Sequence, residues 1–172
     1  VPAGELMNSV RDALSNRGCW QEELDIERRD YIFALIDLWQ SRSRTINELA
    51  DSIAPFLTEA FPYLPEALAE NIRGKDLLGP VEALREGLTQ VDPWNQEELE
   101  VTIRQLAEGF GLEASELIQP CRIAVTGKAS SPGIFEVLEL MGRENTRVRL
   151  DRMIRYLSKV KAAQEGATQV ES

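Results

Sequence analysis

Apolar residues recur along most of the chain at spacings of three and four, which is the period of one face of an α-helix. Leu6, Val10 and Leu14 follow this spacing and predict a helix over residues 3–16. The same pattern predicts further helices over 27–41, from 45 onwards, over 66–74 and 78–90, and from 95 to a stop near 109 or 111. No stretch alternates apolar and polar residues for long enough to predict a strand. We therefore expect an all-α protein.

Two helix starts carry capping residues. Thr45 and Glu48 have the Thr-x-x-Glu form of a capping box, and Asn95 and Glu98 have the matching Asn-x-x-Glu form. Trp94 stands directly before this second cap, where it can pack on the first turns of the helix as a hydrophobic staple.

Two prolines fall inside apolar helical patterns. We expect Pro55 to kink or end its helix near residue 54, because proline removes a backbone donor and clashes with the preceding turn. Pro120 is suited to open a helix over 121–125 that follows a short helix over 115–119 and ends at Gly127. A loop over 128–131, a helix starting around 132–135 and a basic helix over 143–163 complete the prediction.

The turn at residues 91–93 predicts a boundary between two helical subdomains. We expect one subdomain over 1–91, a second over 92–165, and a polar tail over 166–172. Because the connection is short, the two subdomains are expected to pack against each other.

The composition excludes several kinds of active site. Among the 172 residues, 43% are apolar, which is enough to bury a core, and none is histidine. A Ser-His or Cys-His catalytic pair therefore cannot form within the chain. Cys19 and Cys121 lie far apart and predict free thiols in a reducing compartment. No apolar run approaches the roughly 20 residues that span a bilayer, so we expect a cytoplasmic protein that makes no membrane contact.

The formal charge of −10 argues against nucleic-acid binding through bulk charge, but the charges are unevenly distributed. One run is strongly basic and holds only two acids, Glu144 and Asp151. Two interpretations remain for this run, a solvated helix face or a surface that contacts phosphates. Its basic members are Arg143, Arg147, Arg149, Arg152, Arg155, Lys159 and Lys161.

Sequence motifs for cofactor chemistry are absent. The chain has neither a Gly-x-x-x-x-Gly-Lys phosphate loop nor a Gly-x-Gly-x-x-Gly dinucleotide motif. Its many carboxylates, without a partner signature, are expected to be solvated surface. We therefore expect no catalytic group, metal or cofactor within these residues.

Residues 119–136 form the segment best suited to recognition. It places a helix carrying Arg122 beside a loop and the amino end of another helix, whose unpaired N–H groups attract anions or polar base edges. Phe135 has a flat face for an unstacked base, a contact worth roughly 1 to 3 kcal/mol. The alternatives are a core role for Phe135 and a structural ion pair for Arg122.

Five segments follow one another between residue 94 and about 157: 94–100 (WNQEELE), 106–112 (LAEGFGL), 119–127 (QPCRIAVTG), 131–138 (SPGIFEVL) and 140–144 (LMGRE). In order and spacing, this run resembles the carboxy-terminal anticodon-binding domain of bacterial-type glutamyl-tRNA synthetases, which are class I aminoacyl-tRNA synthetases. Earlier, residues 40–46 (QSRSRTI) resemble the family's Gln-x-Arg-x-Lys-Thr-Leu stretch.

The resemblance implies that the chain is a tRNA-binding, non-catalytic fragment. Its full-length parent would attach glutamate to tRNA-Glu using ATP and Mg, through a domain with His-x-Gly-His and Lys-Met-Ser-Lys-Ser motifs that this sequence lacks. The implied partners are the anticodon loop of tRNA-Glu and the rest of the synthetase, and whether tRNA-Gln is also accepted stays open. We expect a monomer.

The resemblance also implies an RNA-binding set. Arg122 would face the anticodon loop, Ser131 would supply a hydroxyl where the family often has threonine, and three apolar residues would surround splayed bases. These three are Pro132, Ile134 and Phe135.

Three further arginines complete the RNA-binding set that the resemblance implies. Arg104 matches a basic position on the preceding helix. Arg42 and Arg44 are both candidates for the contact to the third anticodon base, and the alignment does not choose between them. The basic helix after residue 142 would add long-range attraction, while the net charge predicts weak binding by this part alone.

Two other functions remain open from the sequence. One is an acidic all-α protein-protein interaction module whose Trp39, Phe56 and Tyr63 form a docking surface. The other is a fragment that keeps the fold but has lost anticodon reading.

Overall fold

The computed structural model describes residues 3–20 and 28–171, and within them it is all-α, as predicted. Nine α-helices and one short 3-10 helix account for the regular structure of the described residues, which contain no strand. The predicted helix start at residue 27 lies outside them. Among the helices described, none combines the length and apolar character that a membrane crossing needs.

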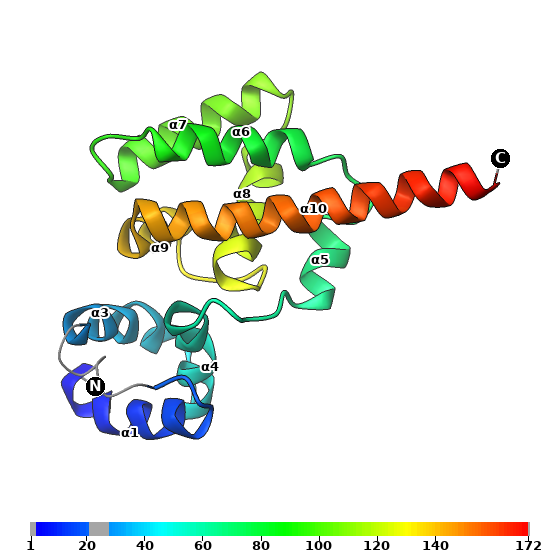
Figure 1. The fold of residues 1–172 in the computed structure, drawn as a ribbon. Helices are drawn as coiled ribbons and strands as arrows, with labels where there is room; N and C mark the ends of the chain where they lie inside the picture. The colour runs from blue at the N-terminus through cyan, green and yellow to red at the C-terminus, as the bar shows by residue number, and fades with distance from the viewer. Residues whose placement is uncertain (1–2, 21–27, 172) are drawn as a thin grey trace. The chain divides into compact units, whose positions relative to one another are not determined.

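The first compact unit extends to Pro62, and its described residues, 3–20 and 28–62, form three α-helices that pack on one another. They are α1 (Ala3–Asn16), α3 (Arg29–Trp39) and α4 (Ile46–Leu57), with the 3-10 helix η1 (Gln40–Arg42) after α3. Figure 1 shows these helices in blue and cyan. The rings of Trp39 and Phe56 meet in the core with centroids 4.8 Å apart.

Trp39 and Phe56 therefore do not form a docking surface. Their side chains are 5% and 3% exposed, because the apolar faces of α3 and α4 enclose them. Tyr63 is half-buried, and its ring lies edge-on to that of Tyr156, 5.6 Å away. The interaction-module interpretation thus loses the aromatic surface on which it was based.

The second unit begins at Tyr63 and contains six helices. They are α5 (Pro65–Asn71), α6 (Leu78–Thr89), α7 (Gln96–Gly109), α8 (Ala114–Thr126), α9 (Ile134–Met141) and α10 (Arg143–Glu171). In Figure 1, α10 runs through this unit in orange and continues past its neighbours in red. It packs on α6, α8 and α9, while α7 packs on α6, α8 and α9.

The division between the two units lies between Pro62 and Tyr63, whereas the sequence predicts a boundary between residues 91 and 92. The reason is that α6 packs against both α10 and α7, which joins residues 63–91 to the carboxy-terminal helices. The 91–93 turn is consequently internal to the second unit. The guanidinium of Arg143 donates a hydrogen bond to the carbonyl of Val91 within this turn.

Both internal prolines lie inside continuous helices, so Pro55 does not end its helix and the prediction that Pro120 opens a new one was wrong. α4 continues through Pro55 to Leu57, and α8 is one helix that runs through Pro120 instead of two short ones. Both rings are buried, so their packing offsets the lost backbone hydrogen bond. The predicted end at Gly127 is confirmed, with φ of +78°, a conformation that glycine adopts without strain.

The predicted amino-terminal caps of α4 and α7 are present. Thr45 Oγ1 accepts from the backbone N–H of Glu48 at 3.1 Å, and Asn95 Oδ1 accepts from that of Glu98 at 2.9 Å. The Glu48 carboxylate reaches back one residue further than a standard capping box and accepts from the backbone N–H of Arg44 at 2.6 Å. Local sequence therefore determines where these two helices begin.

Candidate nucleic-acid interface

The candidate site lies on the carboxy-terminal half of α8 and the loop that leads to α9. Hydrogen bonds hold this loop at its start. Thr126 Oγ1 donates to the carbonyl of Arg122 at 2.7 Å and accepts from the backbone N–H of Lys128 at 3.1 Å. The carbonyl of Gly127 accepts from the backbone N–H of Leu64 at 2.7 Å, which ties the loop to the chain before α5. The loop therefore leaves α8 along a fixed path.

Arg122 bridges α8 and the loop. Its Nε donates to Ser131 Oγ at 2.9 Å, and its Nη1 donates to Gln119 Oε1 at 3.2 Å. Gln119 is three residues earlier on α8, a spacing that places two side chains on one helix face. The structure thus brings two of the predicted site residues, Arg122 and Ser131, into direct contact, and adds Gln119 to them.

Ser131 uses both capacities of its hydroxyl inside the protein. While Oγ accepts from Arg122, it donates to the carbonyl of Pro132 at 2.7 Å. A serine hydroxyl has one proton to donate, so a direct donated bond from Ser131 to RNA would replace this internal one. In this structure the hydroxyl therefore acts on Arg122.

The three apolar site residues differ in exposure. Ile134 is 2% exposed and Pro132 is buried, whereas Phe135 is half-buried and keeps part of its ring accessible. These residues form the loop end and the first turn of α9, whose amino-terminal flank is Gly133. Of the three, Phe135 is the least buried and the aromatic one. Pro132 and Ile134 shape the support beneath it.

Trp94, just before α7, and Gln96, the first residue of α7, both hydrogen-bond to α9. The indole Nε1 of Trp94 donates to the carbonyl of Leu138 at 2.9 Å, and the backbone N–H of Gln96 donates to the Glu139 carboxylate at 3.1 Å. Arg143 lies over the Trp94 ring at 5.6 Å from its centroid. Trp94, predicted only as a staple for α7, therefore also contributes to the placement of α9.

Arg104 lies on the exposed side of α7, where it pairs with Glu100 at 2.9 Å. This is an i,i+4 ion pair on the surface, and such pairs contribute at most about 0.5 kcal/mol, so RNA phosphates can replace it at little cost. The hydrogen bond of Arg104 Nε also goes to the Glu100 carboxylate, at 2.9 Å.

Arg42 and Arg44 belong to the first unit, at the connection between η1 and α4. Arg44 lines a hollow of about 540 Å³ together with Gln40, Thr45 and Leu49, and Arg42 closes η1. Both side chains are exposed. The position of the hollow does not decide which of the two arginines would contact a base, so both stay candidates.

Much of the basic run on α10 serves the fold. Arg147 pairs with Glu144 and, at 2.7 Å, with Asp151. Buried Arg149 donates to the carbonyl of Val125 at 2.8 Å, at the carboxy-terminal end of α8, where the helix dipole favours a cation. The exposed members of the run are Arg143, Arg155, Lys159 and Lys161. The guanidinium of Arg152 lies over the Tyr63 ring at 4.5 Å, with its Nη1 buried.

Two ionisable groups in this unit have pKa values that burial displaces. Burial raises the pKa of the Cys121 thiol, which lies on α8 beside Arg122, to about 12. Burial likewise raises the pKa of Tyr63, against the opposing effect of Arg152, Arg155 and Arg149. Neither group is charged near neutral pH, so neither offers an anion or a nucleophile to a ligand.

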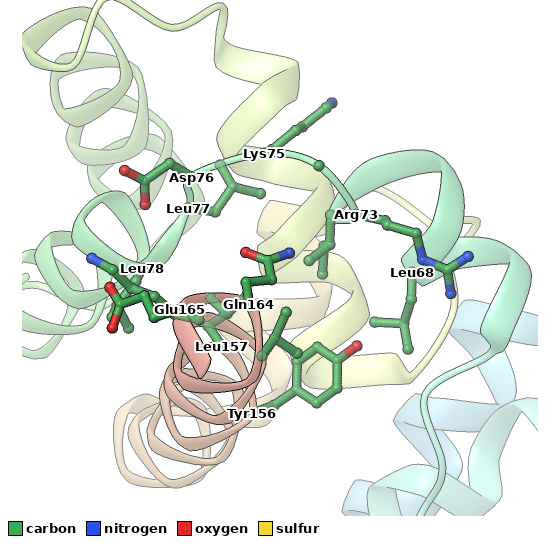
Figure 2. Close-up of a pocket in the computed structure, with 14 residues that line it drawn as sticks. Leu68, Arg73, Lys75, Asp76, Leu77, Leu78, Tyr156, Leu157, Gln164 and Glu165 are labelled. Carbon is green, nitrogen blue, oxygen red and sulfur yellow. The ribbon is translucent and has the colours of Figure 1, made fainter. Parts of the chain in front are cut away.

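A separate hollow of about 640 Å³ lies where the α5–α6 connection approaches the far end of α10. Figure 2 shows apolar walls that include Leu68 and Leu157, with Arg73 and Lys75 at the edge. None of the predicted RNA-binding residues lines it. Across residues 3–20 and 28–171, no group of three or more His, Cys, Asp or Glu side chains is arranged to hold a metal ion. The candidate interface is therefore a surface of fixed side chains without an identified metal centre.

Comparison with known proteins supplies the family. A family model described as "Anticodon binding domain" matches residues 3–154. A glutamate–tRNA ligase of Moorella thermoacetica is 30% identical over 144 residues, and glutamate–tRNA ligase 1 of Nitrosococcus oceani is 31% identical over 155. These matches cover 84% and 88% of this chain, but only 29% and 33% of the relatives.

The fold has the same neighbours. The crystal structure of a glutamate tRNA ligase from Elizabethkingia meningosepticum matches with a TM-score of 0.72 at 17% identity, over 91% of this chain and 30% of that one. At this identity the likeness concerns the fold alone. The family match, which spans most of the chain, shows that this protein belongs to the anticodon binding domain family.

Proposed function

We propose that this chain reads the anticodon loop of tRNA-Glu as the anticodon-binding part of a glutamyl-tRNA synthetase. The observation that carries the proposal is the family match over residues 3–154, together with relatives that are glutamate–tRNA ligases. The geometry of α8, the following loop and α9 supports it. This region combines an oriented cation, an accessible aromatic ring and a helix amino terminus within one short segment.

Each of these groups suits one part of an unstacked loop. The ring of Phe135 stacks on a splayed base, and the guanidinium of Arg122 donates to base or phosphate oxygens. The free N–H groups of the first turn of α9 add donors beside Phe135. Ile134 and Pro132 keep this turn in place through their burial, and Ser131 keeps Arg122 in reach.

The remaining arginines extend the proposal to neighbouring nucleotides. Arg104 gives up its exposed pair with Glu100 to a phosphate. Arg42 or Arg44 in the first unit contacts the third anticodon base and so bears on whether tRNA-Gln is accepted as well. Counterion release at exposed Arg155, Lys159 and Lys161 adds a salt-dependent share of the affinity.

The chain spans about a third of the length of its curated relatives, so the activity of the whole protein is also a proposal. The parent would be a cytoplasmic, monomeric ligase that activates glutamate with ATP and Mg in a part outside these residues. The present residues would contribute recognition of the tRNA and no step of the chemistry.

The test is a fluorescence anisotropy titration against the tRNA-Glu anticodon stem-loop at low and moderate salt. Phe135→Ala and Arg122→Ala are each expected to weaken binding by about tenfold, since a stacked base or a charged hydrogen bond is worth roughly 1 to 3 kcal/mol. Changes of the loop bases should weaken binding of the unmodified chain, and circular dichroism should show that both variants fold.

Two substitutions serve as matched controls. Phe110→Ala removes an aromatic residue that is 46% exposed at the carboxy-terminal end of α7. Arg73→Ala removes an exposed arginine that lines the hollow near the α5–α6 connection. Both are expected to bind like the unmodified chain. Binding that ignores the loop sequence and all four substitutions would contradict anticodon reading and leave only the inherited fold.

A further inference from the structure

The contacts around Arg122 contain a residue that the sequence motif did not single out. Gln119 Oε1 accepts from Arg122 Nη1 at 3.2 Å, while Ser131 Oγ accepts from Arg122 Nε at 2.9 Å. The two acceptors come from different places, one from the same helix and one from the loop. They engage two different nitrogens of one planar group.

Two acceptors on different nitrogens restrict the guanidinium in a way that one cannot. A single hydrogen bond leaves the planar group free to rotate about the donor, whereas bonds to Nε and Nη1 fix both its position and its plane. Arginine otherwise loses rotamer entropy when a ligand immobilises it. An arginine that is already held meets its ligand with less of this loss.

We propose that Gln119 is a positioning residue for anticodon recognition, which with Ser131 holds the Arg122 guanidinium in its binding orientation. The inference rests on the proposed function for the contact between Arg122 and RNA. It assigns Gln119 no contact with RNA. It also gives Ser131 a positioning part, because its hydroxyl donates to Pro132 and accepts from Arg122 within the protein.

The surroundings of Gln119 agree with this assignment. Gln119 is half-buried on α8, directly before the buried Pro120, so its backbone is fixed by the helix. Its carbonyl oxygen adds an acceptor without adding charge. A carboxylate in the same place would hold Arg122 as well but would repel the phosphates of RNA.

The first measurement uses the free protein and does not depend on RNA. The ¹⁵N relaxation of the Arg122 Nε–Hε group is recorded in the unmodified chain, Gln119→Met and Gln119→Glu. Methionine removes the acceptor at similar volume and should lower the order parameter of Arg122, whereas glutamate keeps the acceptor and should preserve it. An unchanged order parameter in Gln119→Met would overturn the positioning role.

The second measurement is a double-mutant cycle with the tRNA-Glu anticodon stem-loop. Gln119→Met is expected to weaken binding about fivefold, comparable to one ordinary hydrogen bond, and to have no effect in an Arg122→Ala background. Ser131→Ala should weaken binding as Gln119→Met does. Ser131→Thr keeps the hydroxyl and should bind like the unmodified chain. Gln90→Met is the control, because it removes an exposed glutamine that pairs with Glu86 on α6.

The outcomes separate the inference from the function on which it rests. If Gln119→Met weakens binding equally in the Arg122→Ala background, Gln119 contacts RNA itself and the positioning role is wrong. If Arg122→Ala binds normally, the proposed contact with RNA fails, while the relaxation data still decide whether Gln119 orders Arg122.

Discussion

The buried arginine of α10 gives the sharpest prediction about stability. Arg149 is 5% exposed, and its Nη1 donates to the carbonyl of Val125 at 2.8 Å, near the end of α8. Arg149→Met keeps much of the side-chain volume but removes the charge and the donor. Because the second unit depends on the contact between α8 and α10, we expect this substitution to lower its free energy of unfolding.

The magnitude follows from the two contributions that are lost. A hydrogen bond with a charged donor contributes about 1.5 to 3 kcal/mol, and a cation at a helix carboxy terminus up to about 2 kcal/mol. Methionine offsets part of this loss, because burying an apolar side chain avoids the desolvation cost of the buried arginine charge. A net loss of about 2 kcal/mol is therefore expected, against less than about 0.5 kcal/mol for Arg155→Met, an exposed position on the same helix.

Hydrogen exchange measured by mass spectrometry suits this test, since two compact units need not unfold together. The best-protected amides of α8 should exchange about thirtyfold faster in Arg149→Met, the equivalent of about 2 kcal/mol. Amides of α4 in the first unit should not change. Equal exchange in Arg149→Met and Arg155→Met would refute the reasoning, because the buried cation would then cost as much to desolvate as it returns.

Three further predictions concern single groups. Since burial raises the pKa of Cys121 to about 12, its thiolate is scarce at pH 8, and we expect a disulfide reagent to modify half-buried Cys19 but to reach Cys121 only in denaturant; rapid modification of both would contradict this. Thr45→Ala should destabilise the first unit by about 1 kcal/mol through loss of its cap, seen as faster exchange at the start of α4, and no change there would count against the cap. The hydrogen bond from Arg147 lowers the pKa of Glu144 below 4.5, so the attraction is present above pH 4.5 and is lost as the pH falls through the lowered value; Arg147→Met should raise the Glu144 midpoint in a carboxyl NMR titration, and an unmoved midpoint would refute the pairing.

Local signals predicted helix starts well. The Thr45 and Asn95 caps depend on a side chain and a backbone N–H three residues away, so the sequence contains both partners. The prolines were misjudged because their fate depends on distant residues. Pro55 and Pro120 are buried by other helices, and that packing outweighs a backbone bond whose loss the sequence alone predicts to be decisive.

The sequence nominates members of the candidate site but does not contain the connections that the structure shows among them. The resemblance nominated Arg122, Ser131 and Phe135, and the structure joins the first two by a hydrogen bond. The bond from Gln119 had one local signal, the i,i+3 spacing on a helix. The ties from Trp94 to α9 had none, because they link residues more than forty positions apart.

The roles of the basic residues on α10 were the least predictable from sequence. The sequence of an arginine run does not show whether each side chain contacts water, phosphate or a protein carbonyl. Buried Arg149 meets the carbonyl of Val125 because α8 packs against α10, whereas the pairs of Arg147 with Glu144 and Asp151 follow the local i,i+3 and i,i+4 spacing of one helix. Charge patterning alone could not separate Arg149 from exposed Lys159 and Lys161.

In the second unit, the residues that keep α9 ordered are different from the residues proposed to contact RNA. At eight residues, this helix is too short to be stable alone in water, so its contacts with Trp94, Gln96 and the core stabilise it. Loss of the contacts from Trp94 or Gln96 would thus make the first turn of α9 fluctuate, although every residue proposed to contact RNA would still be present. Loss of recognition would then arise as an entropic defect, measurable as a less favourable binding entropy with Phe135 and Arg122 intact.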